Sequence, residues 1–139
     1  MNYEFRADVR SALARARDAA IERAHSYVGT EHLLAGLIAV PDCLGTRVLA
    51  ALGAQPKAIR EQLDALVQSG GTFAPGELPY TSRAKKTLEL AMKEARTDGV
   101  DYVDTGHLLT GLLLEEKGVA ANVLGTLGVT LDDVREVGS

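Results

Sequence analysis

Residues 27–37 read YVGTEHLLAGL, and residues 102–112 repeat this stretch as YVDTGHLLTGL. The same offset of 75 residues aligns apolar positions outside the motif without a gap: Leu13 with Leu88, Val48 with Val123, and Leu52 with Leu127. Self-similarity at a constant spacing is the mark of a repeat architecture. The sequence therefore predicts a tandem duplication that folds into two similar halves.

The composition favours a small helical protein. A chain of 139 residues is long enough to bury a core without metals or disulfides. Alanine and leucine fill most apolar positions, aromatic residues make up 4% of the chain, and tryptophan is absent. Such side chains favour closely packed helices over a β-sandwich.

Charge and segment length exclude several classes of function. The formal net charge of −4 opposes the positive field that a nucleic-acid binder needs. No apolar run approaches the roughly 20 residues that span a bilayer, and the N-terminus lacks the apolar segment of a signal peptide. The single cysteine, Cys43, cannot form an internal disulfide. We therefore expect a cytoplasmic protein with neither nucleic-acid nor membrane partners.

We expect the first repeat over about residues 5–68, with four helices. The first helix covers about residues 7–24, because Val9, Leu13 and Ala16 recur at helical spacing. The other boundaries follow from residue types that favour helix ends. Thr30 and Asp42 are predicted N-caps, Pro41 ends the second helix, Gly53 follows the third in the left-handed region, and Pro56 opens the fourth.

Residues 69–80 are rich in glycine and proline and form the expected linker. The second repeat then covers about residues 81–137. Its predicted landmarks are Thr81 and Thr105 as N-caps, a helix over residues 117–127, and Thr130 at the start of the last helix.

The expected fold is a single all-α domain over residues 1–139, with about eight helices in a pseudo-two-fold tandem repeat of two four-helix units. Gly36 and Gly111 fall inside apolar helices, where glycine costs about 1 kcal/mol relative to alanine. Their recurrence predicts that another helix crosses closely at each of them.

The repeated motif, together with YTSRAKK at residues 80–86, resembles the N-terminal domain of the Clp ATPase unfoldases, most closely the ClpC branch. The resemblance covers about residues 5–136. It implies a non-enzymatic docking platform that receives adaptors and substrates, that reads arginine-phosphorylated proteins in the ClpC branch, and that binds cyclic-peptide antibiotics. The chain contains no GxxxxGK[ST] phosphate-binding loop, so the resemblance does not extend to the ATPase modules of that family.

By this resemblance, the motif glutamate, Glu31, contacts the guanidinium group of phosphoarginine, and a carboxylate suits that planar donor. In the second copy the corresponding residue is Gly106, and Asp104 stands where the first copy has glycine. The hypothesis is one phosphoarginine site rather than two. The alternative is that Glu31 only stabilises the N-terminus of a helix.

The phosphate of such a ligand needs donors and positive charge. Arg10 and Lys85 hold corresponding positions on the first helix of each half, and Thr81 precedes the second of these helices. Helix N-termini attract anions through free N–H groups and the helix dipole. We therefore predict that Arg10, Thr81 and Lys85 contact the ligand. The alternative is that they are solvated residues of amphipathic helices.

Three aromatic residues, Phe5, Phe73 and Tyr80, flank the linker and the first helix of each half. If they are exposed, Phe5 and Tyr80 are candidate contacts for partner peptides. Buried rings that anchor the helix starts are the alternative.

The two motif histidines, His32 and His107, lack the spacing of a metal or catalytic pair, so we predict that each hydrogen-bonds a neighbouring loop. Cys43 has Gly118 as its counterpart and no base within sequence reach, which favours a small residue at a helix start. A hydrolase that uses His32 or His107 with Cys43 is therefore the weakest interpretation. No catalytic residue, metal ligand or cofactor is assigned.

Two interpretations of function stay open. The first is a non-enzymatic protein-recognition module for substrate or adaptor docking in Clp-type proteolysis, with phosphoarginine-tagged proteins among its ligands. The second is a stand-alone scavenger or decoy that binds cyclic-peptide antibiotics or phosphoarginine, or an accessory subunit of a Clp complex. A scavenger binds the small ligand without being retained by Clp rings.

Overall fold

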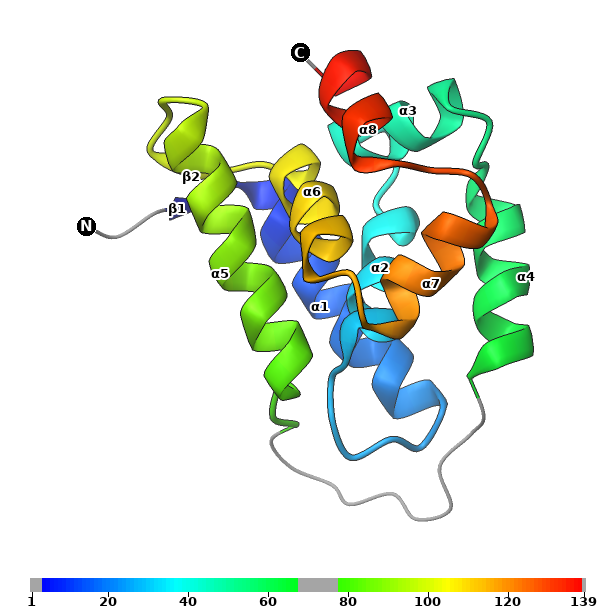
Figure 1. The fold of residues 1–139 in the computed structure, drawn as a ribbon. Helices are drawn as coiled ribbons and strands as arrows, with labels where there is room; N and C mark the ends of the chain where they lie inside the picture. The colour runs from blue at the N-terminus through cyan, green and yellow to red at the C-terminus, as the bar shows by residue number, and fades with distance from the viewer. Residues whose placement is uncertain (1–3, 68–77, 139) are drawn as a thin grey trace.

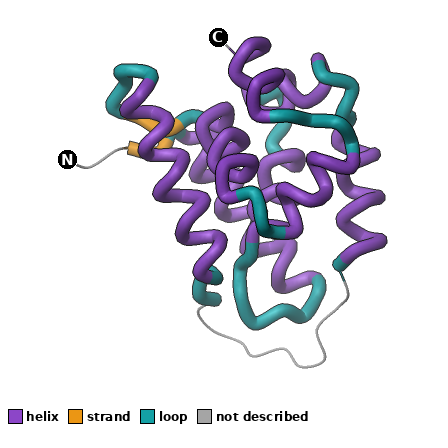
Figure 2. Tube along the Cα trace, in the orientation of Figure 1, coloured by secondary structure: helices purple, strands orange, loops and turns teal. Residues whose placement is uncertain are grey.

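The computed structural model describes residues 4–67 and 78–138, which form eight helices (Figures 1 and 2). The first repeat contributes α1 (Ala7–Glu22), α2 (Thr30–Ala39), α3 (Leu44–Ala51) and α4 (Pro56–Leu66). The second contributes α5 (Ser82–Thr97), α6 (Thr105–Glu115), α7 (Val119–Thr126) and α8 (Leu131–Gly138). The predicted all-α tandem repeat is confirmed. Most of the expected linker, including Phe73, lies outside the described residues.

Two short parallel pairings join the repeats. Strand β1 (Glu4–Phe5) pairs with β2 (Tyr102–Val103), and an isolated parallel bridge joins Val28 to Tyr80. Val28 corresponds to Val103 and Tyr80 to Phe5, so the two pairings are one contact made twice about the pseudo-two-fold axis. The sequence pattern did not predict these strands, because each one pairs with a segment far away in the chain.

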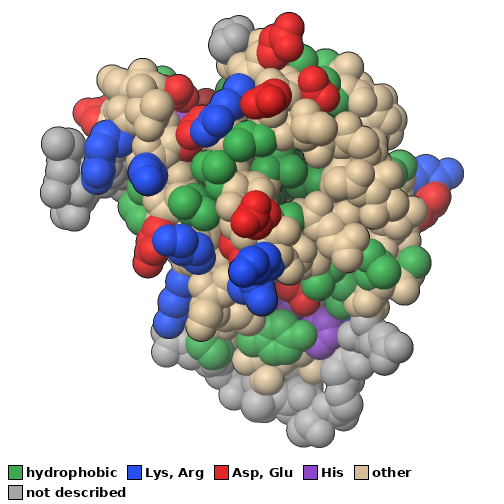
Figure 3. All heavy atoms as spheres, viewed as in Figure 1, with side chains coloured by type: hydrophobic (Ala, Val, Ile, Leu, Met, Phe, Trp, Pro, Cys, Tyr) green, Lys and Arg blue, Asp and Glu red, His purple; other side chains and the backbone are tan. Residues whose placement is uncertain are grey.

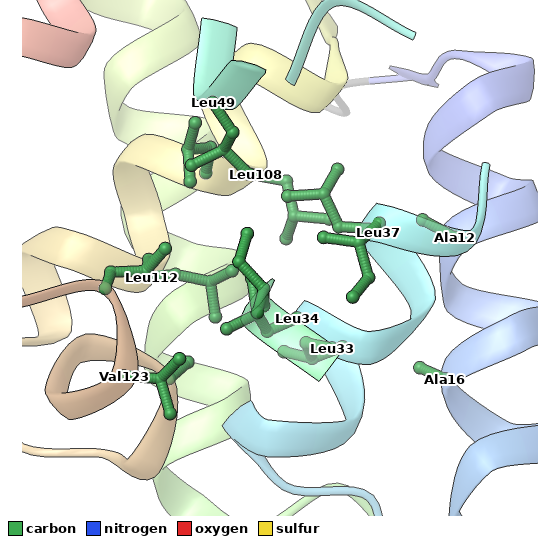
Figure 4. Close-up of a cluster of buried hydrophobic side chains, with 14 of the residues drawn as sticks. Ala12, Ala16, Leu33, Leu34, Leu37, Leu49, Leu108, Leu112 and Val123 are labelled. Atoms are coloured by element: carbon green, nitrogen blue, oxygen red, sulfur yellow. The ribbon is translucent and has the colours of Figure 1, made fainter. Parts of the chain in front are cut away.

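The core lies between α2 and α6, which occupy the middle of the molecule (Figure 1). Both helices are apolar on nearly every side and are therefore surrounded by the others. Six of their leucines have no exposed surface: Leu33, Leu34 and Leu37 of α2, and Leu108, Leu109 and Leu112 of α6. Figure 4 shows leucines of both repeats meeting Leu49 of α3 and Val123 of α7. The two repeats therefore share one core.

The shorter helices interlock across the repeats. In the first repeat, α3 packs against α6 and α8 of the second. In the second repeat, α7 packs against α2 and α4 of the first. Neither four-helix unit therefore covers its own apolar surface, and the fold requires both. No single helix among the described residues is long and apolar enough to cross a membrane, although α2 and α3 together, bent by 92°, meet the criteria of length and composition.

The motif glycines mark close crossings, as predicted. A Cβ atom on Gly36 would lie 2.7 Å from the backbone nitrogen of Ala16 in α1. A Cβ atom on Gly111 would lie 2.5 Å from the carbonyl oxygen of Thr87 in α5. Both distances are too short for a real side chain, so α1 crosses α2, and α5 crosses α6, at backbone contact.

Several predicted helix boundaries are confirmed. Pro56 is the first residue of α4, and the Thr81 hydroxyl accepts from the Ala84 N–H at 3.1 Å. Gly53, with φ of +86°, ends its helix in the left-handed region. The Thr130 hydroxyl accepts from the Asp133 N–H at 3.2 Å, at the start of α8.

Three predicted N-caps are wrong. Thr30 and Thr105 are the first residues of α2 and α6, and the residues before them occupy the cap positions. Asp42 has a φ of +54° and precedes Cys43, which is the N-cap of α3. Predicted helix lengths also differ by one or two residues: α1 ends at Glu22 because Ala24 is left-handed, with φ of +57°.

The motif threonines cap helices of the opposite repeat instead. The Thr105 hydroxyl accepts from the Gly45 N–H of α3 at 2.9 Å. The Thr30 hydroxyl accepts from the Ala120 N–H of α7 at 3.3 Å. The N-caps of α3 and α7 supply no side-chain hydrogen bond of their own, so each threonine satisfies an N–H group that would otherwise lack a partner. These two bonds fasten the interlocked helices.

Candidate binding sites

The Val28–Tyr80 bridge places the start of α2 beside the start of α5. Val28 donates its N–H to Pro79 at 2.9 Å, and Thr81 donates its N–H to Val28 at 2.9 Å. Glu31 follows in the first turn of α2, and Lys85 lies one turn into α5. We call this region, with Glu31, Thr81 and Lys85, the Glu31 edge.

The Glu31 carboxylate is held over the start of its own helix. It lies above Gly29, so closely that a side chain at position 29 would collide with it. Burial, and then the charge of Glu31, raises the pKa of the Tyr27 phenol. Glu31 is half-buried, so part of the residue stays in contact with solvent.

A buried histidine pair supports the Glu31 edge from below. The Gly29 N–H donates to Nδ1 of His32 at 2.8 Å, which places the proton of the neutral ring on Nε2. That Nε2 lies 2.7 Å from Nδ1 of His25, and the Tyr27 ring stacks on His25. Burial, and to a smaller extent His25 and Arg23, lowers the pKa of His32 to about 4. His32 thus hydrogen-bonds the neighbouring loop, as the sequence predicts.

The α5 side of the Glu31 edge is basic. Lys85 and Lys86 are exposed, and Arg83 forms an ion pair with Glu115 of α6 at 3.0 Å. Lysine and arginine side chains gather over α5 on the face shown in Figure 3. The N-terminus of α5 adds its dipole and its free N–H groups. This edge therefore brings a carboxylate together with a site that attracts anions.

Arg10 does not belong to the Glu31 edge. It lies at the equivalent edge of the other repeat, where the Arg6 N–H donates to Val103 at 3.0 Å. The Arg10 guanidinium donates to the Phe5 carbonyl at 2.6 Å. By the pseudo-two-fold symmetry, the loop that follows Val103 brings Gly106 to this edge. The structure therefore pairs Arg10 with the copy of the motif that lacks glutamate.

The equivalent edge differs from the Glu31 edge in its polar contacts. The Arg6 guanidinium lies 4.6 Å from the centre of the Tyr102 ring. Asp104 caps α6 by accepting from the Thr105 N–H at 2.7 Å. The Asp104 N–H donates to Nδ1 of His107 at 3.0 Å, and Nε2 of His107 lies 2.7 Å from Asp98. His32 and His107 thus accept the equivalent backbone N–H at the start of their helices, but Nε2 faces His25 in the first repeat and Asp98 in the second.

The two candidate aromatic contacts are half-buried. Phe5 packs against a small cluster around Val9 and Val103, and Tyr80 packs against the main core. Burial raises the pKa of the Tyr80 phenol. Both rings anchor the paired segments and keep some exposed surface.

Cys43 is 1% exposed, and its sulfur lies 2.9 Å from the Thr46 hydroxyl. Its burial fits the structural role predicted for it. No group of three or more histidine, cysteine or acidic side chains that could hold a metal ion occurs among the described residues.

Arg6 and Tyr27 also belong to these edges, although neither was predicted as a site residue from the sequence. Arg6 corresponds to Thr81 at the repeat offset, and its N–H group makes the same backbone contact. Comparing the two copies beyond the motif would have found it. Tyr27 was visible within the motif, but its position beside Glu31 depends on how the loop folds.

Comparison with known proteins gives a consistent result. The family model described as the Clp repeat (R) N-terminal domain matches residues 4–113 and again residues 79–138. The chain is 41% identical over 124 residues to the negative regulator of genetic competence ClpC/MecB of Bacillus subtilis, which covers 89% of this chain and 15% of that protein. It is 40% identical over 120 residues to the chloroplastic chaperone protein ClpC1 of Arabidopsis thaliana, covering 86% and 13%. The chain thus spans a small part of the length of these relatives.

Solved structures share the fold. The N-terminal domain of the chaperone ClpD from Arabidopsis thaliana has a TM-score of 0.75 and 23% identity, covering 97% of this chain and 92% of that one. The N-domain of ClpV from Vibrio cholerae has a TM-score of 0.82 and 17% identity, covering 96% and 81%.

Proposed function

This chain belongs to the family of Clp repeat N-terminal domains, and we propose that it docks protein substrates or adaptors for a Clp-type ATPase. We expect the domain to bind substrates without catalysing a reaction of its own. The arrangement that best supports a docking role is the Glu31 edge, where a half-buried carboxylate and the basic start of α5 meet through the Val28–Tyr80 bridge.

We further propose that the Glu31 edge reads phosphoarginine on tagged proteins. A guanidinium group is a planar fork of donors that a carboxylate accepts well, so Glu31 suits the nitrogen side of the ligand. The phosphoryl group needs positive charge and N–H donors, which Lys85 and the N-terminus of α5 supply. Glu31, Thr81 and Lys85 share this edge because the bridge joins their two segments.

The chain has one such site by this proposal. At the equivalent edge, Gly106 has no side chain to accept from a guanidinium, although Arg6 and Arg10 provide positive charge there. Asp104 also adds a carboxylate near the place that a phosphate would take, and like charges repel.

Replacing Glu31 by alanine is expected to weaken phosphoarginine binding about tenfold or more, because hydrogen bonds to charged groups contribute about 1.5–3 kcal/mol. Isothermal titration with free phosphoarginine measures the effect, and the wild-type chain should bind one equivalent. Glu61→Ala, on the exposed side of α4, is the matched control and should bind as the wild type does. Absence of binding by the wild type, or two equal sites, contradicts the proposal.

Replacing Gly106 by glutamate together with Asp104 by glycine, which removes the carboxylate that would repel the phosphate, is expected to create a second phosphoarginine site beside Arg6 and Arg10. The new Cβ atom would lie 3.1 Å from a terminal methyl of Leu44, a flexible group that can move aside. The stoichiometry of this double variant in the same titration should rise from one to two, and the addition of Glu31→Ala should return it to one. An unchanged stoichiometry in the folded double variant argues against equivalent edges.

A further inference from the structure

A cavity of about 550 Å³ opens between α3, α5, α6 and α8. Its walls include Leu44 and Val48 of α3 and Val134 of α8, with Thr97 and Thr110 between them. Apolar side chains are also visible between α5 and α8 in Figure 3. Ligand sites in proteins commonly have volumes of about 300–1,000 Å³ and apolar walls with a few polar groups. The cavity is thus large enough for several side chains of a partner.

The charged lining of this cavity is mainly acidic. Glu94, Asp98 and Asp104 line it, and Arg135 is the cation among the described lining residues. Glu94 already neutralises Arg135, which donates to it from Nε at 3.0 Å and from Nη2 at 2.9 Å. Besides Glu94, Asp98 also acts on Arg135 and helps to raise the pKa of that guanidinium, but the three carboxylates outnumber the one guanidinium, so the lining keeps a net negative charge.

His107 orients the Asp98 carboxylate. Nδ1 of His107 accepts from the Asp104 N–H, so Nε2 carries a proton and donates it to Asp98. This hydrogen bond occupies one acceptor position of the carboxylate. The Asp98 side chain is 54% exposed, so it can accept from a second donor on the cavity side.

Gly106 keeps the cavity open at the start of α6. It is itself a lining residue, and a Cβ atom there would lie only 3.1 Å from Leu44. Any longer side chain at position 106 would fill space that a ligand can use. The residue that removes the phosphoarginine contact from the second repeat therefore also opens this cavity.

We propose that this cavity binds a partner-protein segment in which one unmodified arginine or lysine is flanked by apolar residues. The apolar neighbours pack against Val48 and Val134. The cationic group approaches Asp98 and Asp104, and carboxylates form their strongest hydrogen bonds with such groups. A phosphorylated arginine is disfavoured here, because its phosphate would face the same carboxylates. The two repeats then recognise different states of the same residue type.

The test uses a synthetic peptide of leucine and alanine with one central arginine, acetylated and amidated at its ends. Matched peptides carry glutamine or phosphoarginine at the centre. Titration of the full chain, followed by backbone NMR, should show the arginine peptide binding about tenfold more tightly than either of the others. The largest shifts should fall on cavity residues such as Val48, Thr97, Thr110 and Val134. Equal binding of the arginine and glutamine peptides, or no binding at all, overturns the proposal.

Asp98→Asn combined with Asp104→Asn removes the charge and keeps the hydrogen bonds, since asparagine also accepts from His107 and also caps helices. This variant should bind the arginine peptide no better than the glutamine peptide. Thr97→Lys, an exposed change at the rim, provides a second variant with the same expected loss. Glu61→Ala, on the exposed side of α4 and away from both candidate sites, should leave arginine-peptide binding unchanged. Undiminished binding by both cavity variants refutes the assignment.

Discussion

Replacing Gly36 by alanine is expected to lower the free energy of unfolding by about 3 kcal/mol, the upper range for overpacking a tight core. The new methyl group would meet the Ala12 carbonyl oxygen and lie 2.7 Å from the Ala16 nitrogen. Both are backbone atoms of α1, which yield only if α1 and α2 move apart. Alanine gains about 1 kcal/mol in helix propensity over glycine, which is too little to offset the collision.

Two other glycines calibrate this prediction. Gly111→Ala meets the Thr87 carbonyl oxygen at 2.5 Å and should destabilise the protein less than Gly36→Ala does. Gly125, inside α7, has nothing within 4 Å of an added Cβ atom, so Gly125→Ala should stabilise the protein by about 0.5–1 kcal/mol. Urea unfolding followed by circular dichroism measures all three. If Gly36→Ala proves as stable as Gly125→Ala, the close crossing of α1 and α2 is wrong.

Acidification from pH 6.5 to pH 4 is expected to cost about 3 kcal/mol of stability through His32 alone. In the folded state the pKa of His32 is about 4, against an ordinary value of 6.5 in the unfolded chain. Between these two values the unfolded state binds the extra proton, so stability falls by about 1.4 kcal/mol per pH unit as the pH drops. Above pH 6.5 this contribution is constant.

The surroundings of His32 explain why the folded state resists protonation. The side chain is 1% exposed, and a proton on Nδ1 would displace the Gly29 N–H that donates to it. The positive charge of the protonated His32 ring would also lie beside His25 and near Arg23. Protonation therefore breaks the cap of α2 as well as burying a charge.

The measurement is the free energy of unfolding as a function of pH, compared between the wild type and His32→Gln. Glutamine keeps an acceptor for Gly29 and a donor for His25 but does not titrate, so the wild type should lose about 3 kcal/mol more than this variant. Subtracting one curve from the other cancels the contribution of the carboxylates, because they titrate in both proteins. His107→Gln is the matched control. It should lose the same free energy of unfolding on acidification as the wild type does through His32. Parallel curves for the wild type and His32→Gln would disprove the assignment to His32.

The sequence predicted features that depend on local chemistry or on the duplication. The offset between the motif copies identified two equivalent halves, and apolar spacing identified the helices. Pro56, Thr81 and Gly53 marked helix ends because their effect acts within a few residues of the chain. Gly36 and Gly111 indicated close crossings because glycine inside a helix has a local cost that only packing offsets.

Residue types alone could not place the candidate site residues together. Arg10 and Glu31 belong to the same repeat, yet Arg10 lies at the edge of Gly106, while Glu31 shares its edge with Thr81 and Lys85 of the other repeat. Parallel pairings between distant segments decide this arrangement. No local pattern in the chain records those pairings.

By itself, the sequence determined the family, the duplication and the helical class, because these follow from the identity of the motif residues and from the spacing of the apolar residues. Only the tertiary structure decided that Thr30 and Thr105 cap helices of the opposite repeat and that four helices enclose an acidic cavity. The physical reason is that neither repeat buries its apolar surface alone. The helices interlock, and the hydrogen bonds and charges that form across the repeats depend on that packing.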